Sequence, residues 1–190
     1  NGEIYFSYIT PDQYAAIAKQ DKNGNVSITK IFHDVHEDGH HKASLGIDKN
    51  GYIHYAADMH SHTHVRPANE DTNVRDNSIY FWQYWISDKP YDISSFSFYG
   101  DDPNRVIPGE YVTYPRFVRD KKDDLYVTFR CRVSDKYEPG TFSAAIAKYD
   151  PEKRKWNMLG GTDYPHGEKT MIWHEVGRGG NTAYQSYNVG

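Results

Sequence analysis

Eight of the ten histidines lie between residues 33 and 64. They are His33, His36, His40, His41, His54, His60, His62 and His64. Histidine has the unperturbed pKa nearest to neutrality, so a cluster of this density favours proton transfer or metal binding over packing. A strand-like stretch separates the two histidine-rich ends of the segment, and we interpret the whole segment as one wall of an active site.

Two hairpins are expected to position the chemistry. His40 precedes one predicted strand and His60 follows the next, so the hairpin returns both to one end of a sheet. Residues 111–117 and 129–132 hold the corresponding places in a later hairpin and supply a tyrosine and one or two arginines. Tyrosine and histidine can serve as general base and acid, and arginine pairs with a carboxylate as a two-pronged donor. This combination suits β-elimination beside a uronate, in which arginine neutralises the carboxylate and a base removes the C5 proton.

The histidine run also permits a metal site. In an extended strand, residues i and i+2 share a face about 7 Å apart. His60, His62 and His64 could therefore bind zinc, with His36 or Asp58 as a further ligand, in a zinc-dependent hydrolase. No cysteine ligand lies nearby in the sequence, and no HExxH motif is present.

The composition of the 190 residues is typical of strands and turns. Aromatic residues make up 15% of the chain, with 17 tyrosines and 4 tryptophans against 3 methionines. A formal charge of −4 provides no general basic field, which disfavours nucleic acid as a partner. The single cysteine, Cys131, excludes an internal disulfide, and no apolar stretch is long enough to span a membrane. No signal peptide is recognisable, and residues 4–8 are strand-like, so we expect the chain to start inside a structural unit, as in a mature or trimmed product.

Two internal repeats organise the chain. Residues 15–19 and 144–148 share the sequence Ala-Ala-Ile-Ala-Lys, and each copy is followed by an aspartate. Residues 80–88, about halfway between them, form another predicted strand ending in an Asp-led turn, which gives a period of about 64 residues. Residues 47–55 match residues 119–127 as strand, tight turn and strand.

Each repeat reads as four antiparallel strands, which is the signature of a β-propeller blade. We predict an incomplete β-propeller of about three to four blades in one region, 1–190. Residues 1–34 would form the later strands of one blade, 38–100 a second blade, 110–160 a third, and 170–190 the start of the next. A β-sandwich is the alternative, and no sustained helical periodicity is present.

Other enzyme chemistries lack their motifs here. The sequence has no recognisable carboxylate pair for glycoside hydrolysis, no GxSxG and no phosphate-binding loop. A non-catalytic alternative is a carbohydrate-binding propeller that stacks sugars on Trp82, Trp85 and Trp173.

Three stretches resemble a known family. DGHHKASLGIDKNGYIHYAADMH, TYPRFVRDKKDDLYVTFR and AAIAKYD are similar to sequences of BNR-repeat-type propellers, which include the ulvan lyases of polysaccharide lyase families 24 and 25. The likeness covers about residues 36–150. It implies a seven-bladed propeller that cleaves ulvan, a sulfated polymer of rhamnose and uronic acid, by β-elimination without a catalytic metal. The chain departs from the family pattern at His41 and Ala43.

The resemblance also implies the site residues. The catalytic histidines fall on His40 and His60, the tyrosine on Tyr114 and the carboxylate-neutralising arginine on Arg130. Substrate-binding residues are predicted at His41, Arg116, Arg132 and Trp82.

The remaining expectations concern partners, cofactors and location. We expect an anionic, sulfated polysaccharide as substrate, no nucleic acid or membrane partner, and a second chain or further segment that completes the propeller. No cofactor is expected in catalysis, and a structural calcium or zinc ion is left open. The expected location is secreted, periplasmic or cell-surface.

Overall fold

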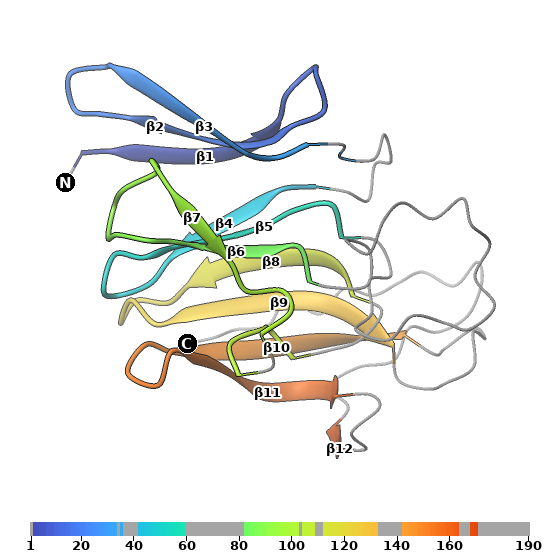
Figure 1. Cartoon of the computed structure of the whole chain (residues 1–190). Coiled ribbons are helices and arrows are strands. Elements are labelled where there is room, and N and C mark those ends of the chain that lie inside the picture. Colours follow the sequence, from blue (N-terminus) through green and yellow to red (C-terminus); the bar gives the residue numbers. More distant parts are fainter. Residues whose placement is uncertain are drawn as a thin grey trace.

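The protein is built from β-strands. The computed structural model describes residues 2–33, 35, 42–59, 82–102, 104–108, 112–132, 142–163 and 168–170. Within these residues every helix or strand assigned is a strand, and the strands form three antiparallel sheets arranged in a row (Figure 1). No helix in this part of the chain is long and apolar enough to cross a bilayer. The predicted all-β class is therefore confirmed.

Consecutive strands are neighbours in all three sheets. The first sheet contains β1 (Ile4–Ile9), β2 (Ala15–Gln20) and β3 (Val26–Phe32). The second contains β4 (Ser44–Ile47), β5 (Ile53–Ala56), β6 (Tyr84–Ser87) and β7 (Phe96–Phe98). The third contains β8 (Thr113–Arg119), β9 (Leu125–Arg132), β10 (Phe142–Asp150), β11 (Lys155–Asp163) and β12 (Glu168–Thr170). The blade boundaries given above stay a prediction, since residues 171–190 lie outside the described part.

Three hairpins share one turn, which explains the match between residues 47–55 and 119–127. In each, an aspartate Oδ1 accepts the backbone N–H groups of the residues two and four positions later, at 2.8–3.0 Å. These aspartates are Asp21, Asp48 and Asp120. The third residue after each has a positive φ: Gly24 and Gly51 at 87° and Asp123 at 62°. The aspartate supplies a local hydrogen-bond acceptor, so the same short sequence closes a hairpin in every sheet.

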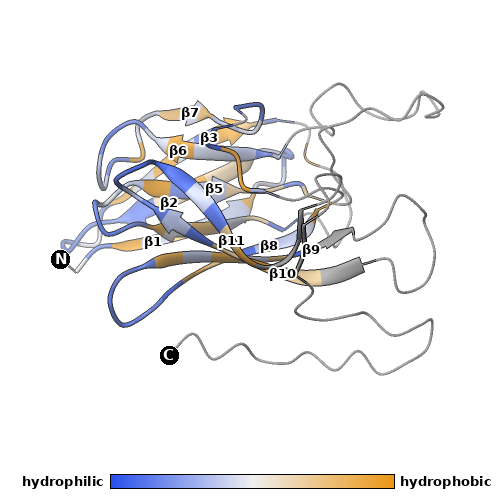
Figure 2. Ribbon diagram, turned by 90° about the horizontal axis from the view of Figure 1, so that it is seen from below, coloured by the Kyte–Doolittle hydropathy of each residue, from blue (hydrophilic) through white to orange (hydrophobic). Residues whose placement is uncertain are grey.

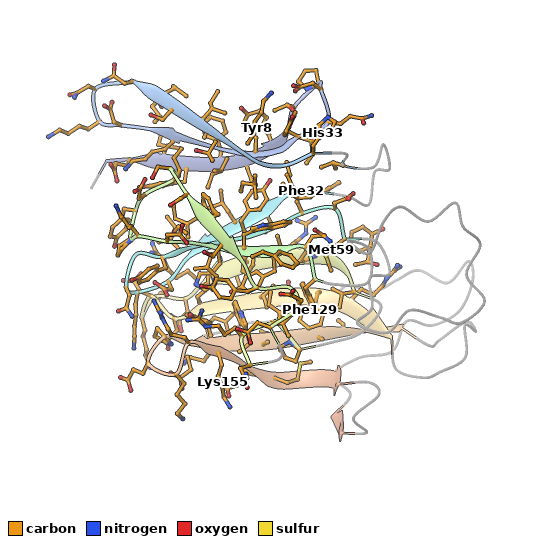
Figure 3. The ribbon with its side chains drawn as sticks, viewed as in Figure 1. Tyr8, Phe32, His33, Met59, Phe129 and Lys155 are labelled. Carbon is orange, nitrogen blue, oxygen red and sulfur yellow. The ribbon has the colours of Figure 1, made fainter. Side chains whose placement is uncertain are left out.

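The second sheet is buried on both faces. Ile53 and Tyr55 of β5 belong to the apolar cluster shared with the first sheet, as does Trp85 of β6. Tyr84 and Ile86 point the other way and belong to the cluster shared with the third sheet. Figure 3 shows Phe32 between the first and second sheets, and Met59 and Phe129 between the second and third. Alternation of side chains along the strands thus builds two cores around one sheet.

The first sheet keeps one apolar face exposed. Phe6 of β1 pairs with Ala18, which pairs with Ile28 of β3, so the three share a face. Ile4 and Val26 extend this face. All four large side chains are at least 45% exposed. Figure 2 shows hydrophobic stretches within the strands and hydrophilic residues at the hairpin turns. No sheet of the described residues covers this surface.

The first strands of the second and third sheets lie side by side. The backbone N–H of Phe117 on β8 donates to Ser44 Oγ at the start of β4, at 3.1 Å. A Cβ added at Gly46 would lie 2.6 Å from Phe117 Cβ. Glycine is therefore required at position 46 for β4 to approach β8 this closely.

Candidate active site

Tyr114 and Arg130 meet at one end of the third sheet. Thr113 of β8 pairs with Arg130 of β9, but the next paired residue on β8 is Arg116, opposite Thr128. This shift leaves Tyr114 and Pro115 in a β-bulge. Bulges twist a strand locally and redirect the side chains that they contain.

The backbone of Tyr114 is in a left-handed conformation. Its φ is 60°, which is rare for a bulky residue. Such a conformation costs about 1–3 kcal/mol and is kept where the surrounding structure imposes it, often at functional sites. Asp58, which is buried two residues before His60, also has a positive φ, of 54°. Two of the predicted site motifs therefore contain strained backbone.

The Arg130 guanidinium lies over the Tyr114 ring. Its Cζ is 5.3 Å from the ring centroid, and Nη2 donates to Thr113 Oγ1 at 3.3 Å. Both side chains are only partly exposed. The ring and the threonine hydroxyl orient the guanidinium, and a positioned arginine can pair with a carboxylate through two hydrogen bonds. The structure thus brings together two of the four residues predicted to be catalytic.

The other predicted catalytic residues, His40 and His60, lie outside the described residues, as does His41. The strands next to them are described: β4 starts at Ser44 and pairs with Ala56 near the end of β5. β4 and β8 start at the same end of the molecule, the end at which Arg130 lies near the end of β9 (Figure 1). The assignments of these three histidines stay predictions.

The two further arginines of the prediction are on the third sheet. Arg116 is exposed on β8, immediately after the bulge. Arg132 is the last residue of β9 and pairs with Phe142, but its side chain is not among those described. Their roles in substrate binding stay predictions.

Trp82 has a packing role. Only 2% of its surface is exposed, and its ring lies edge-on to Phe129 with the centroids 5.2 Å apart. Trp85 is also buried and stacks on Phe32 at 4.7 Å. Buried rings offer no open face to a sugar, so the predicted substrate-binding role of Trp82 and the stacking role of Trp85 are wrong. Trp173, the third tryptophan of the carbohydrate-binding alternative, lies outside the described residues.

Comparison with known families decides the family of the chain. Residues 3–189 match the model of a family described as "BNR repeat-containing family member". The chain belongs to the BNR repeat-containing family. No protein of curated function matches this BNR repeat-containing chain.

Solved structures similar to this BNR repeat-containing chain include polysaccharide lyases. One is polysaccharide lyase Uly1, with a TM-score of 0.62 and 16% identity, covering 83% of this chain and 39% of that one. Another is a PL25 ulvan lyase bound to -[GlcA(1-4)Rha3S]-, with a TM-score of 0.58 and 21% identity, covering 83% of this chain and 34% of that one. The chain therefore spans well under half of either structure. The predicted fold, a β-propeller of antiparallel blades with about three to four blades in this chain, is confirmed.

The zinc alternative rests on residues outside the description. His60, His62, His64 and His36 all lie there. Among the side chains that are described, no three His, Cys, Asp or Glu residues gather as a metal site. His33 is exposed, with its ring 4.4 Å from that of Tyr14. The zinc site stays a prediction.

His54 is a buried structural residue of this BNR repeat-containing protein. Its Nδ1 lies 2.6 Å from Tyr84 Oη, which accepts the indole N–H of Trp156 at 3.1 Å. Its Nε2 lies 3.5 Å from Asp48 Oδ2. Since Tyr84 accepts from Trp156, the tyrosine proton is available for His54 Nδ1, and the histidine proton on Nε2 faces Asp48. Its position inside β5, a strand that is buried on both faces, separates His54 from the other histidines.

The unfolding free energy is expected to fall as the pH drops below about 6.5, the usual histidine pKa. Burial lowers the pKa of His54, and Asp48 opposes the shift only in part. The unfolded chain therefore binds this proton first, so the stabilisation is complete above the unfolded pKa and is lost as the pH falls toward the folded one. The free energy of unfolding, measured with urea between about pH 7.5 and 5, should depend less on pH in His54→Phe than in the original protein. The exposed His33→Gln variant serves as the control, and an unchanged slope in His54→Phe would contradict the prediction.

Proposed function

We propose that this chain is part of a polysaccharide lyase that cleaves a uronate-containing polymer, ulvan in particular, by β-elimination. The observation that carries the proposal is the Arg130 guanidinium positioned over the strained Tyr114 at a bulge. Membership of the BNR repeat-containing family and a fold shared with polysaccharide lyases support it. The bound -[GlcA(1-4)Rha3S]- of one such lyase supports a sulfated, uronate-containing substrate here.

In the proposed reaction Arg130 neutralises the uronate carboxylate, which makes the C5 proton acidic. A base removes that proton, its electron pair forms the C4=C5 double bond, and the C4–O bond breaks. The leaving oxygen takes a proton from an acid. We assign the base and acid roles to the set of His40, His60 and Tyr114. The fixed cation beside the developing enolate supplies most of the stabilisation of the transition state.

Two expectations about partners belong to this proposal. An apolar face around Phe6 and Ile28 is exposed on the first sheet, and we propose that a further sheet packs there, from another chain or another segment of a longer one. The proposed substrate is an extracellular polymer, so we place the protein in a secreted, periplasmic or cell-surface location.

Ultraviolet absorbance tests the proposal, because the C4=C5 double bond next to a carboxylate absorbs at ultraviolet wavelengths at which the substrate does not absorb. The protein should raise the absorbance of ulvan solutions, and more strongly than that of other uronate polymers. We also propose that no metal takes part in the chemistry, so the signal should survive a chelator. Loss of the signal with chelator would favour the zinc-dependent hydrolase or a structural ion. A chain that binds ulvan without any signal would be a carbohydrate-binding propeller instead.

A further inference from the structure

A polar cavity lies between the second and third sheets. Its volume is about 130 Å³. It is lined by the hairpin that joins β4 to β5, the end of β6, the loop after β7 and the hairpin that joins β10 to β11. These hairpins lie at the end of the sheets opposite to Tyr114 and Arg130 (Figure 1). The cavity is therefore separate from the candidate active site.

Two arginines of this cavity pair with no carboxylate of the described residues. The Cζ of Arg105 is 4.5 Å from the Tyr99 ring centroid, and the Cζ of Arg154 is 5.3 Å from that of Tyr52. Within the described residues, neither guanidinium lies within ion-pair distance of a carboxylate. Stacking on the tyrosine rings holds both side chains without using their N–H groups. The cavity thus presents two cations, the half-buried Arg105 and the exposed Arg154, whose side-chain N–H groups have no hydrogen-bond partner within the described part of the chain.

A tyrosine hydroxyl adds a neutral donor. Tyr149 lines the same cavity, and burial raises its pKa to about 12. Its hydroxyl therefore keeps its proton near neutrality. No other described residue forms a hydrogen bond with this hydroxyl, so it can donate to a ligand.

The two carboxylates that line the cavity are already engaged. Asp48 Oδ1 accepts the backbone N–H groups of Asn50 and Tyr52, and its Oδ2 faces His54. Asp88 Oδ1 accepts the Ser97 hydroxyl at 2.6 Å. Both carboxylates therefore already accept hydrogen bonds from neighbouring groups of the protein, whereas the two guanidinium groups donate none to the described residues. The N–H groups of the two arginines and the Tyr149 hydroxyl can therefore bind an oxyanion.

We propose that this cavity is a second ligand site, which binds the carboxylate or sulfate group of one acidic sugar. Arg105 and Arg154 pair with the oxyanion, and Tyr149 donates to it. The cavity is well below the roughly 300–1,000 Å³ of pockets for larger ligands, so it fits one charged sugar unit. The site would hold an acidic saccharide away from the residues proposed to cleave it. The cavity itself indicates an oxyanion, and the assignment of that oxyanion to an acidic sugar rests on the proposed function.

Nuclear magnetic resonance titration of the ¹⁵N-labelled chain tests the site. Glucuronate, inorganic sulfate and neutral glucose are added separately, and the amide signals of Asn50 and Arg154 are followed. Saturable shifts with glucuronate or sulfate, but not with glucose, are expected. The Arg105→Gln/Arg154→Gln variant should weaken binding of the anion by at least about tenfold, the effect of losing one charge-assisted pair. Tyr149→Phe, which removes only the hydroxyl, should weaken it by about fivefold.

Lys153→Ala is the matched control, because Lys153 is an exposed cation on the same hairpin and pairs with Asp150. The Lys153→Ala variant should bind the anion with the same affinity as the original chain. Three results would overturn the proposal. Glucose could bind as tightly as glucuronate, neither anion could show saturable binding, or the double arginine variant could bind the anion as tightly as the original chain does. These titrations involve no turnover, so they can fail while the lyase proposal stands, and they can succeed where no cleavage occurs.

Discussion

Replacement of Arg130 by alanine is expected to lower the turnover number for a uronate polymer by about 10³-fold, the usual effect of removing a principal stabiliser of developing negative charge. The guanidinium is held by the Tyr114 ring and by Thr113 Oγ1, so it can meet a carboxylate without reorganising. Arg130→Lys should recover only part of the rate, because an ammonium group keeps the charge but lacks the two-pronged geometry. Initial rates from ultraviolet absorbance give the measurement.

The stability of the variants separates a chemical role from a structural one. Arg130 is partly exposed at the end of its strand, so Arg130→Ala should retain the fold, as judged by its unfolding midpoint. Tyr114→Phe keeps the ring beneath the guanidinium and should still lower the chemical step by about 10²–10⁴-fold if the hydroxyl transfers a proton. Arg119→Ala, on the hairpin at the other end of β8, is the control and should leave turnover unchanged. If the Arg130→Ala variant and the Tyr114→Phe variant both kept full activity, neither residue would belong to the catalytic set.

Substitution of Gly46 is expected to destabilise the protein by forcing β4 away from β8. An alanine Cβ would lie 2.6 Å from Phe117 Cβ and 2.7 Å from Leu125 Cδ1. The leucine methyl can rotate away, but Phe117 Cβ is fixed to its backbone, so β4 must move away from β8. Overpacking of this kind costs about 1–3 kcal/mol for a small addition. Gly46→Leu should cost more than Gly46→Ala.

Urea unfolding of Gly46 and Gly24 variants measures this steric effect. No atom lies within 4 Å of a Cβ added at Gly24, where φ is 87°. Alanine and leucine at Gly24 should therefore cost similar amounts, about 1–2 kcal/mol, from the left-handed backbone alone. If the cost at Gly46 did not grow with side-chain size, close packing of β4 on β8 would not be the reason for this glycine.

The fold was predictable because its information is local. The Asp-led turns repeat at Asp21, Asp48 and Asp120, and each closes a hairpin through its own side chain. The match between residues 47–55 and 119–127 therefore predicted a real structural repeat. The strand-and-turn composition and the lack of helical periodicity likewise indicated the class of the protein, since neither needs knowledge of distant contacts.

The arrangement of side chains around the sites was harder to predict from the sequence. The bulge at Tyr114 depends on pairing across two strands, and no short motif specifies it. Trp82 resembled a sugar platform by its type, but packing on Phe129 between two sheets buries it. His54 belonged to the histidine cluster by position, yet its place on β5 directs it into the core. Arg105 and Arg154 follow strands of different sheets and line one cavity, and the sequence alone does not bring them together.

The sandwiched second sheet has a consequence for how the molecule opens. Each sheet of the row is stabilised through the interfaces with its immediate neighbours, as in a one-dimensional array. The second sheet shares two such interfaces, whereas the first sheet has one and leaves its Phe6 face in solvent. Local opening should therefore begin with the first sheet, and the amide hydrogens of β5 and β6 should be the last to exchange. A neighbour added on the Phe6 face would extend that cooperativity outward and protect the first sheet as well.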